Sequence, residues 1–192
     1  MTTVSTATMA QEKKNYKEIK FGLTSEIINV SADELWKIVG PGFEVAGTWA
    51  TAVDHSEGSG TPNFEGATCS ERSCDLNAKG FSKIKEVITI YNIQKRTLAF
   101  DVTEGLPGFV QISNSHWQII DLGNNQCKIE ITITAKADKF MGTLMGGMLK
   151  SNFKKTIPTI FRDLKIYAET GNISKEKQER LAKVKDKQLA IK

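Results

Sequence analysis

Residues 82–104, SKIKEVITIYNIQKRTLAFDVTE, carry the pattern that decides the fold. Apolar and polar residues alternate on both sides of the turn-forming segment NIQKR at residues 92–96. Alternation with a period of two is typical of half-buried β-strands. The stretch therefore predicts an antiparallel hairpin with strands over residues 82–92 and 96–104.

The same alternation continues beyond this hairpin. Further strands are expected near residues 22–30, 52–57, 66–76, 109–121 and 126–137. The segments between strands, such as EGSGTPNFEG, EGLPG and DLGNNQ, are rich in the glycine, asparagine and proline that turns require. We expect a meander of about six consecutive antiparallel strands, with the strand at 22–30 as an additional member.

Helices are expected before and after the meander. Ser31 and Glu34 form the capping box of a short helix that a Gly-Pro-Gly segment must end. A second short helix follows over residues 43–52. Apolar residues then recur every three to five positions over 140–169, which predicts a long amphipathic helix that Pro158 bends or breaks.

This order of elements defines the fold class. An open sheet must bury its apolar face, and only the long C-terminal helix is large enough to cover it. We predict an α+β fold, in which a curved antiparallel sheet of about seven strands wraps around that helix and two short helices plug one end. Such an arrangement leaves room for a ligand cavity.

Length and charge indicate one domain with a basic tail. The chain has 192 residues, of which 40% are hydrophobic and 25% are charged. We expect a flexible lead-in over 1–20, the domain over 21–170, and a helical or frayed tail over 171–192. The net charge of +4 belongs to the tail, where residues 172–192 contain seven basic and three acidic residues. The neutral body argues against a nucleic-acid partner.

The sequence also limits location and cofactors. The N-terminus lacks the pattern of a secretory signal, and no apolar run approaches the ~20 residues needed to span a bilayer. We expect a cytoplasmic protein without an integral membrane segment, and a monomer. Cys69, Cys74 and Cys127 have no metal-like spacing, and His55 and His116 are the only histidines. No nucleotide-binding glycine motif occurs, so neither a metal nor another cofactor is expected.

Several stretches within residues 22–169 resemble the START-like (SRPBCC) superfamily, in its polyketide cyclase/dehydrase and lipid-transport branch. They are INVSADELWKIVG, GTWATAVDHSEG, and KIKEVITIYNIQKRTLAFDVTEGLPG followed by ISNSHWQII. The resemblance implies the helix-grip fold and a cavity for sterols, lipids, plant hormones, aromatic polyketides or similar molecules. It implies less about reaction, because the superfamily includes carriers, receptors and cyclases.

Four residues are candidates for acid–base catalysis: Glu104, Glu86, Arg72 and His116. Strand alternation places both glutamates on otherwise apolar faces, where an unpaired carboxylate is costly. The alternatives are a solvent-facing strand end for Glu104 and a core salt bridge to Arg72 for Glu86. Arg72 could instead clamp a ligand carboxylate or enol.

His116 and Trp117 are neighbours on one predicted strand, so only one of them faces the cavity. An inward Trp117 packs better and leaves His116 at the surface. An inward His116 would be a proton carrier at neutral pH.

The predicted ligand-binding residues are aromatic or flexible side chains. They are Phe43, Trp49, Phe64, Phe100, Phe109 and Trp117, with Met141, Leu144, Met145 and Met148 from the long helix. The family resemblance implies that Trp49 helps to line or close the cavity entrance, and the alternative is simple core packing. Phe43, Phe64 and Phe109, which lie beside loops, could form a lid. The glycines among the methionines indicate close packing of the helix on the sheet or a bending gate.

Three functions remain open from the sequence. The first is a carrier or binding protein for a small apolar or aromatic molecule. The second is a cofactor-free cyclase, dehydratase or isomerase of a polyketide-like or related natural product, which folds its substrate in the cavity and moves protons. The third is an interaction module whose cavity has collapsed and whose basic tail binds a partner. The tail by itself is either a solvated, fraying extension or a weak contact to a partner or a membrane surface.

Overall fold

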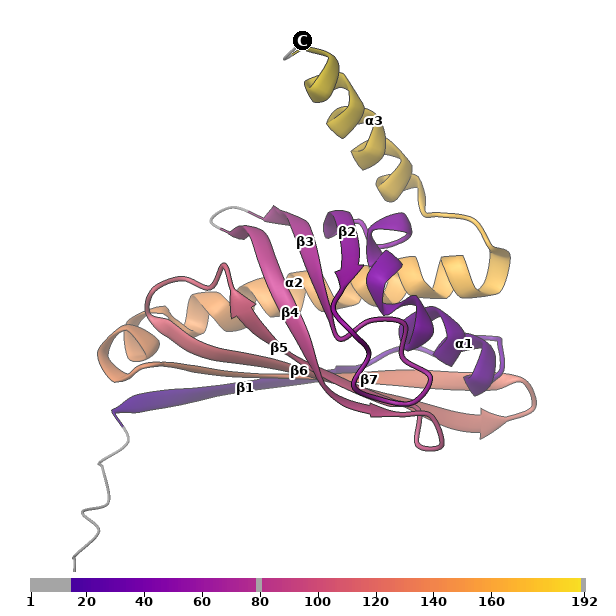
Figure 1. Cartoon of the computed structure of the whole chain (residues 1–192), viewed down its shortest axis with the longest axis horizontal. Helices are drawn as coiled ribbons and strands as arrows, with labels where there is room; N and C mark the ends of the chain where they lie inside the picture. Colours follow the sequence, from indigo (N-terminus) through magenta and orange to yellow (C-terminus); the bar gives the residue numbers. More distant parts are fainter. Residues whose placement is uncertain (1–14, 79–80, 191–192) are drawn as a thin grey trace, which may run out of the picture.

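The computed structural model describes residues 15–78 and 81–190, and its elements follow one another largely as expected (Figure 1). The strands are β1 (Tyr16–Thr24), β2 (Val53–Ser59), β3 (Glu71–Ala78), β4 (Phe81–Asn92), β5 (Thr97–Glu104), β6 (Val110–Gly123) and β7 (Gln126–Asp138). The helices are α1 (Ala32–Val39), the 3₁₀ helix η1 (Pro41–Thr48), α2 (Lys139–Thr170) and α3 (Lys175–Ala190).

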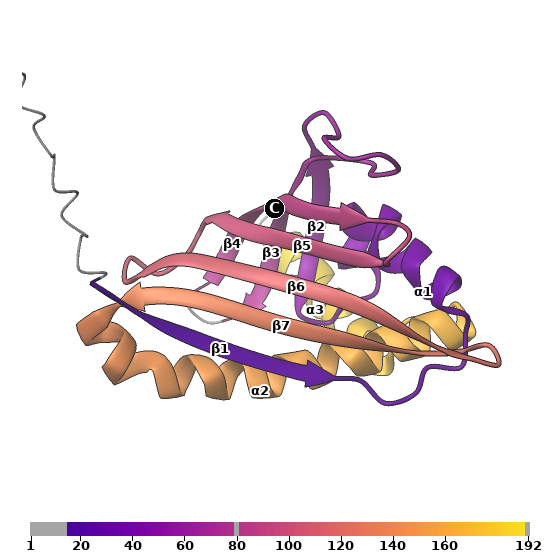
Figure 2. The ribbon, with the colours of Figure 1, turned by 90° about the horizontal axis from the view of Figure 1, so that it is seen from below.

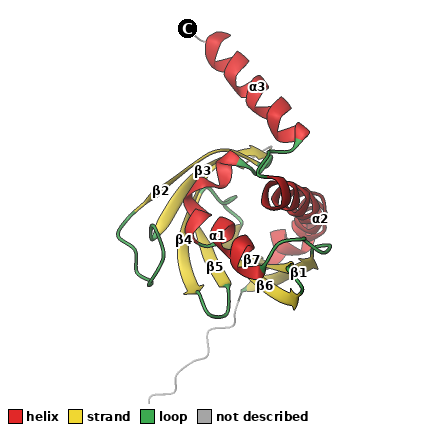
Figure 3. Ribbon diagram, turned by 90° about the vertical axis from the view of Figure 1, so that its right-hand side faces the viewer, coloured by secondary structure: helices red, strands yellow, loops and turns green. Residues whose placement is uncertain are grey.

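The seven strands form one antiparallel sheet in the order β1-β7-β6-β5-β4-β3-β2. Strands β2 to β7 are a meander, and β1 joins the far edge by pairing with β7. Register irregularities interrupt several of the pairings, including β3 with β4 and β4 with β5. Such irregularities bend strands and increase their twist. The sheet therefore curls around the helices, as the end-on view in Figure 3 shows.

The two short helices close one end of the curled sheet. The predicted capping box of α1 is confirmed, because Glu34 N donates to Ser31 Oγ (3.1 Å) and the Glu34 carboxylate accepts from Ser31 N (2.9 Å). Arg96, in the β4–β5 turn, reaches α1 and donates to Asp33 Oδ1 (2.7 Å). The second helix, η1, is a 3₁₀ helix that starts and ends slightly earlier than predicted.

The long helix α2 lies along β1 and β7 (Figure 2). Asp138 caps its first turn by accepting hydrogen bonds from Phe140 N and Met141 N. The helix is continuous through Pro158, so the predicted break is absent. Near its start, a Cβ on Gly142 would lie 3.1 Å from Ala137 Cβ and 3.2 Å from Lys17 Cβ. The glycine thus permits the close helix-to-sheet packing that was one of the two predicted roles.

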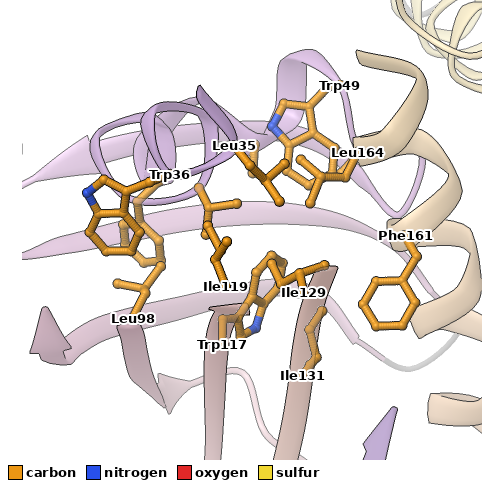
Figure 4. Close-up of a cluster of buried hydrophobic side chains, with 14 of the residues drawn as sticks. Leu35, Trp36, Trp49, Leu98, Trp117, Ile119, Ile129, Ile131, Phe161 and Leu164 are labelled. Carbon is orange, nitrogen blue, oxygen red and sulfur yellow. The ribbon is translucent and has the colours of Figure 1, made fainter. Parts of the chain in front are cut away.

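A large apolar core joins α1, the middle of the sheet and the C-terminal half of α2. Ten of its side chains are labelled in Figure 4: Leu35, Trp36, Trp49, Leu98, Trp117, Ile119, Ile129, Ile131, Phe161 and Leu164. All ten are buried. The smaller cluster at the other end of the sheet contains Ile19, Val110 and Leu149. These two clusters anchor α2 at both ends of the sheet and leave the space between them for a cavity.

The basic tail forms α3, whose first turns are attached to β2. The Lys177 side chain is fully buried and donates from Nζ to the carbonyl of Val53 (2.6 Å). Arg180 donates from Nε and Nη2 to the two carboxylate oxygens of Asp54. The remainder of α3 projects away from the domain (Figure 1).

The N-terminal boundary differs from the prediction. Strand β1 starts at Tyr16, whereas residues 1–20 were expected to be a flexible lead-in and the strand was expected at 22–30. Residues 1–14 lie outside the described part of the chain. Ile19, Phe21 and Leu23 alternate with polar residues or glycine and face the core, so the alternation of this strand begins inside the segment that was assigned to the lead-in. Beyond β1, Ile28 keeps a single isolated bridge to Cys127.

Candidate functional site

A cavity of about 500 Å³ lies between the concave face of the sheet, the plug helices and α2. The plug helices close its inner end with Ile38, Val39, Phe43 and Ala46. Alternate residues of β5 and β6 form one wall: Leu98, Phe100 and Val102, then Ser113, Ser115 and Trp117. The middle of α2 covers the cavity with Leu149, Phe153 and Ile160.

The cavity opens between β3 and the middle of α2. Four of its lining residues are exposed to solvent, namely Asn77 from β3 and Asn152, Lys155 and Thr156 from α2. They define the mouth of the cavity. Sequence reasoning missed all four, because polar residues at a rim look like ordinary surface residues.

Arg72 and Glu86 form a buried ion pair in the cavity wall. The two residues are direct neighbours on β3 and β4, and Arg72 Nε donates to Glu86 Oε2 over 2.5 Å. Each side chain is less than one-tenth exposed. The predicted alternative of a core salt bridge for Glu86 is therefore confirmed, and both residues also line the cavity.

Aromatic rings surround the guanidinium of Arg72. Its Cζ lies 3.9 Å from the ring centroid of Phe43 and 5.1 Å from that of Phe100, and its Nη1 donates to the Phe43 carbonyl (2.6 Å). Burial opposes the charged form, but the carboxylate of Glu86 outweighs it, so the pKa of Arg72 is raised above its ordinary value. The guanidinium is thus permanently charged and held in a fixed orientation.

Cys74 lines the cavity beside this pair, with Sγ 3.7 Å from Glu86 Oε2. Burial raises the pKa of its thiol to about 12. Because the thiolate is the nucleophilic form, this thiol is inert at neutral pH. Cys74 therefore contributes apolar surface to the cavity.

The predicted inward orientation of Trp117 is confirmed. Trp117 is buried, lines the cavity, and donates from Nε1 to Ser115 Oγ (2.8 Å) on the same face of β6. His116 is half-buried on the opposite face and does not line the cavity. His55 is exposed on β2.

Glu104 lies at the exposed end of β5, opposite Lys85, and does not line the cavity. Its placement on an inward face was wrong. The β4–β5 register is irregular between Lys85 and Glu86, so the alternation that brings Val102 inward does not continue to the strand end. The alternative of a solvent-facing strand end describes Glu104 correctly.

The structure divides the predicted ligand-binding residues into two groups. Four of them line the cavity: Phe43, Trp49, Phe100 and Trp117. Six do not: Phe64, Phe109, Met141, Leu144, Met145 and Met148. Trp49 is both a cavity and a core residue, and its indole Nε1 is buried without a hydrogen-bond partner among the described residues.

The prediction that the start of α2 lines the cavity was wrong, because this part of the helix packs on the sheet through its glycines. Gly142 and Gly146 are buried against β1 and β7, and a Cβ on Gly146 would lie 3.3 Å from Ile19 Cδ1. Leu144 and Met148 consequently point away from the sheet and are exposed. One turn later, Leu149 and Phe153 take the covering role that was expected of the methionines.

The described residues contain no group of histidine, cysteine and acidic side chains that could hold a metal ion. None of the described helices is long and apolar enough to span a membrane.

A curved sheet that grips one long helix over an internal cavity defines a START-like helix-grip protein. The family of polyketide cyclase / dehydrase and lipid transport proteins matches residues 21–169, and the chain belongs to this family. A comparison with curated proteins gives no match.

Solved structures share the fold at low sequence identity. A START superfamily protein from Mycobacterium smegmatis has 15% identity and a TM-score of 0.65, over 80% of this chain and 99% of its own. Norcoclaurine synthase from Thalictrum flavum, in complex with a transition-state analogue, has 13% identity and a TM-score of 0.63 over 81% of this chain and 98% of its own. The di-domain ARO/CYC BexL from the BE-7585A biosynthetic pathway has 11% identity and a TM-score of 0.62, over 79% of this chain and 47% of its own.

Proposed function

We propose that the protein binds one small, largely apolar molecule in its cavity and orients a polar acceptor group of that molecule toward Arg72. The observation that carries this proposal is the fixed guanidinium in an otherwise mostly apolar wall. A fixed guanidinium, held by its partner Glu86 in a mostly apolar cavity, gives orientation, and the apolar walls give affinity.

The volume and the lining support such a ligand. A cavity of about 500 Å³ falls within the range of small-molecule sites, roughly 300–1,000 Å³. Arg72 uses Nε and Nη1 for Glu86 and Phe43, and no hydrogen bond involves its Nη2 among the described residues. A carboxylate, enolate or phenolate oxygen is a suitable acceptor for the remaining donors.

The binding test is recovery of unchanged compound. The purified chain is incubated with a panel of fatty acids, sterols and aromatic polyketides, separated from free compound, extracted, and assayed by chromatography with mass detection against a protein-free control. We expect stoichiometric retention of at least one class. No retention of any class would contradict the cavity as a binding site.

Two matched variants test whether retention occurs in the cavity. Val102→Trp places a large ring in the cavity wall, whereas Thr103→Trp places the same ring at the adjacent exposed position. We expect Val102→Trp to abolish retention and Thr103→Trp to preserve it. Arg72→Met combined with Glu86→Leu, which leaves neither charge buried without its partner, should retain fatty alcohols better than fatty acids if the guanidinium holds the acidic group.

A cofactor-independent enzyme is the second candidate, and the presence of Glu86 beside Arg72 in the cavity favours it. Glu86 could accept a proton from a bound substrate while Arg72 stabilises the anion that forms. The observable is a new product that accumulates past one equivalent. Glu86→Gln should then reduce turnover far more than binding, and Glu104→Gln, outside the cavity, should change neither.

A further inference from the structure

The N-terminal half of α2 carries an exposed apolar stripe formed by Phe140, Leu144 and Met148. These side chains are 76%, 68% and 47% exposed, and Phe140 and Leu144 are the two most exposed of the large apolar residues that the structure describes. Their spacing of four residues places them on one face of the helix. Burial in the core does not explain this face, since Gly142 and Gly146 occupy the side that packs on the sheet.

The stripe lies next to the mouth of the cavity on the surface of α2. Asn152 follows Met148 by four residues on the same side of α2 and lines the mouth, together with Lys155. The β5–β6 loop lies beside the start of the helix, because Asp138 N donates to the Phe109 carbonyl (2.8 Å). From this loop, Leu106 also lines the cavity. A surface that covered the stripe would therefore lie next to the opening.

The charge around the stripe has one sign. Between Lys139 and Arg162 the helix contains no acidic residue, and Lys150, Lys154 and Lys155 are exposed along it. Apolar side chains flanked by lysines favour the interface of a membrane with anionic headgroups, where the rings and methyl groups enter the acyl boundary and the ammonium groups remain among the phosphates.

We propose that the Phe140–Leu144–Met148 stripe docks the protein on an anionic lipid bilayer, with the cavity mouth at the membrane surface. This inference goes beyond ligand binding in the cavity and does not depend on it. A second copy of the chain is a poorer occupant, because two identical stripes would bring their lysines together. The projecting part of α3 is also a poorer candidate, since its apolar residues are few and its charges are mixed.

Vesicle co-sedimentation of the full-length chain tests the docking. We expect binding to phosphatidylcholine vesicles that contain phosphatidylserine, weak binding to pure phosphatidylcholine, and loss of binding as salt rises. Phe140→Ser and Leu144→Ser should each weaken binding by about tenfold or more, given the apolar area that each side chain buries. Lys150→Glu with Lys154→Glu should weaken it on the anionic vesicles only.

The matched control is Leu122→Ser. Leu122 is 43% exposed in the β6–β7 hairpin, at the opposite end of the sheet from the start of α2 (Figure 2). Its substitution should leave vesicle binding unchanged. All substituted side chains are exposed, so circular dichroism and thermal midpoints should match those of the wild type.

A second readout reports which surface meets the bilayer. Leu144→Cys and Leu122→Cys are labelled with an environment-sensitive dye, and the three native cysteines are buried. On anionic vesicles the dye at position 144 should shift to the blue, and the dye at position 122 should not. The proposal is overturned if the wild type does not bind anionic vesicles, or if Phe140→Ser and Leu144→Ser bind them as the wild type does. It is equally overturned if binding is abolished only by Lys183→Glu with Lys185→Glu in α3. It is also overturned if the stripe variants dissociate a dimer without any change at vesicles.

Discussion

Arg72 and Glu86 face each other across β3 and β4 in the cavity wall, with Nε of the arginine 2.5 Å from Oε2 of the glutamate. A buried pair of this kind has a large desolvation cost that its mutual attraction offsets only when both partners are present. The same ion pair therefore affects both the stability of the sheet and the charge in the cavity wall.

We predict that removing one partner of this pair lowers the free energy of unfolding more than removing both partners does. Glu86→Leu should lower the free energy of unfolding by about 3–5 kcal/mol, because it leaves a buried guanidinium without its carboxylate. Arg72→Met with Glu86→Leu should recover most of this loss. Urea unfolding of the four proteins in the cycle measures the coupling, and additive effects would contradict a direct interaction.

Alanine substitutions at two glycines of α2 should have opposite effects. Gly147→Ala meets no atom within 4 Å and should raise stability by up to about 1 kcal/mol through helix propensity. Gly142→Ala brings its Cβ to 3.1 Å from Ala137 Cβ, so it should lower stability by about 1–3 kcal/mol despite the same gain in propensity. Thermal midpoints compare the pair, and equal shifts would refute close packing at Gly142.

The native thiols should resist alkylation near neutral pH. Burial raises the pKa of Cys74 to about 12 and that of Cys127 to about 11, and it also raises the pKa of Cys69. Iodoacetamide at pH 8 should therefore modify the folded chain far more slowly than the chain in urea. Mass spectrometry of intact protein follows the labelling. Rapid modification of Cys74 in the native protein would show that the cavity opens widely.

Lys177 should make stability depend on pH in the alkaline range. Burial lowers the pKa of Lys177 below 10.5, against the attraction of Asp54 and Asp163. Between the lowered folded value and 10.5 the unfolded chain binds more protons, so the contribution of this group to stability rises with pH. The difference in unfolding free energy between wild type and Lys177→Met should grow in favour of the wild type as pH rises through this window. Exposed Lys175→Met is the control and should show no such trend.

The period-two pattern was sufficient to predict most of the sheet and its order. Residues 82–104 form the predicted hairpin of β4 and β5, and the capping box of α1 is present as expected. The salt bridge between Arg72 and Glu86 was one of two alternatives that the residues allowed. These features depend on local alternation and on charge pairing, which a sequence displays directly.

The cavity face of α2 could not be predicted in the same way. A hydrophobic pattern locates a buried face by its large side chains, but the start of α2 packs on the sheet through Gly142 and Gly146. The large residues Phe140, Leu144 and Met148 then lie on the exposed side. Glu104 was misplaced for a related reason, because an irregular register interrupts strand alternation without any signal in the sequence.

The pairing of β1 with β7 has a consequence for how the chain acquires its structure. Tyr16 lies opposite Asp138, so β1, the first of the described strands to be synthesised, pairs within the described sheet only with β7, the last of them. Contacts between residues so distant along the chain form slowly, because a large loop must close before any of them is gained. During synthesis the edge of β1 remains unpaired until β7 is made, and the apolar face of the unfinished meander remains uncovered until α2 is made. We therefore expect folding of the domain to be completed only after β7 and α2 have been synthesised, with early dependence on chaperones that shield exposed strands.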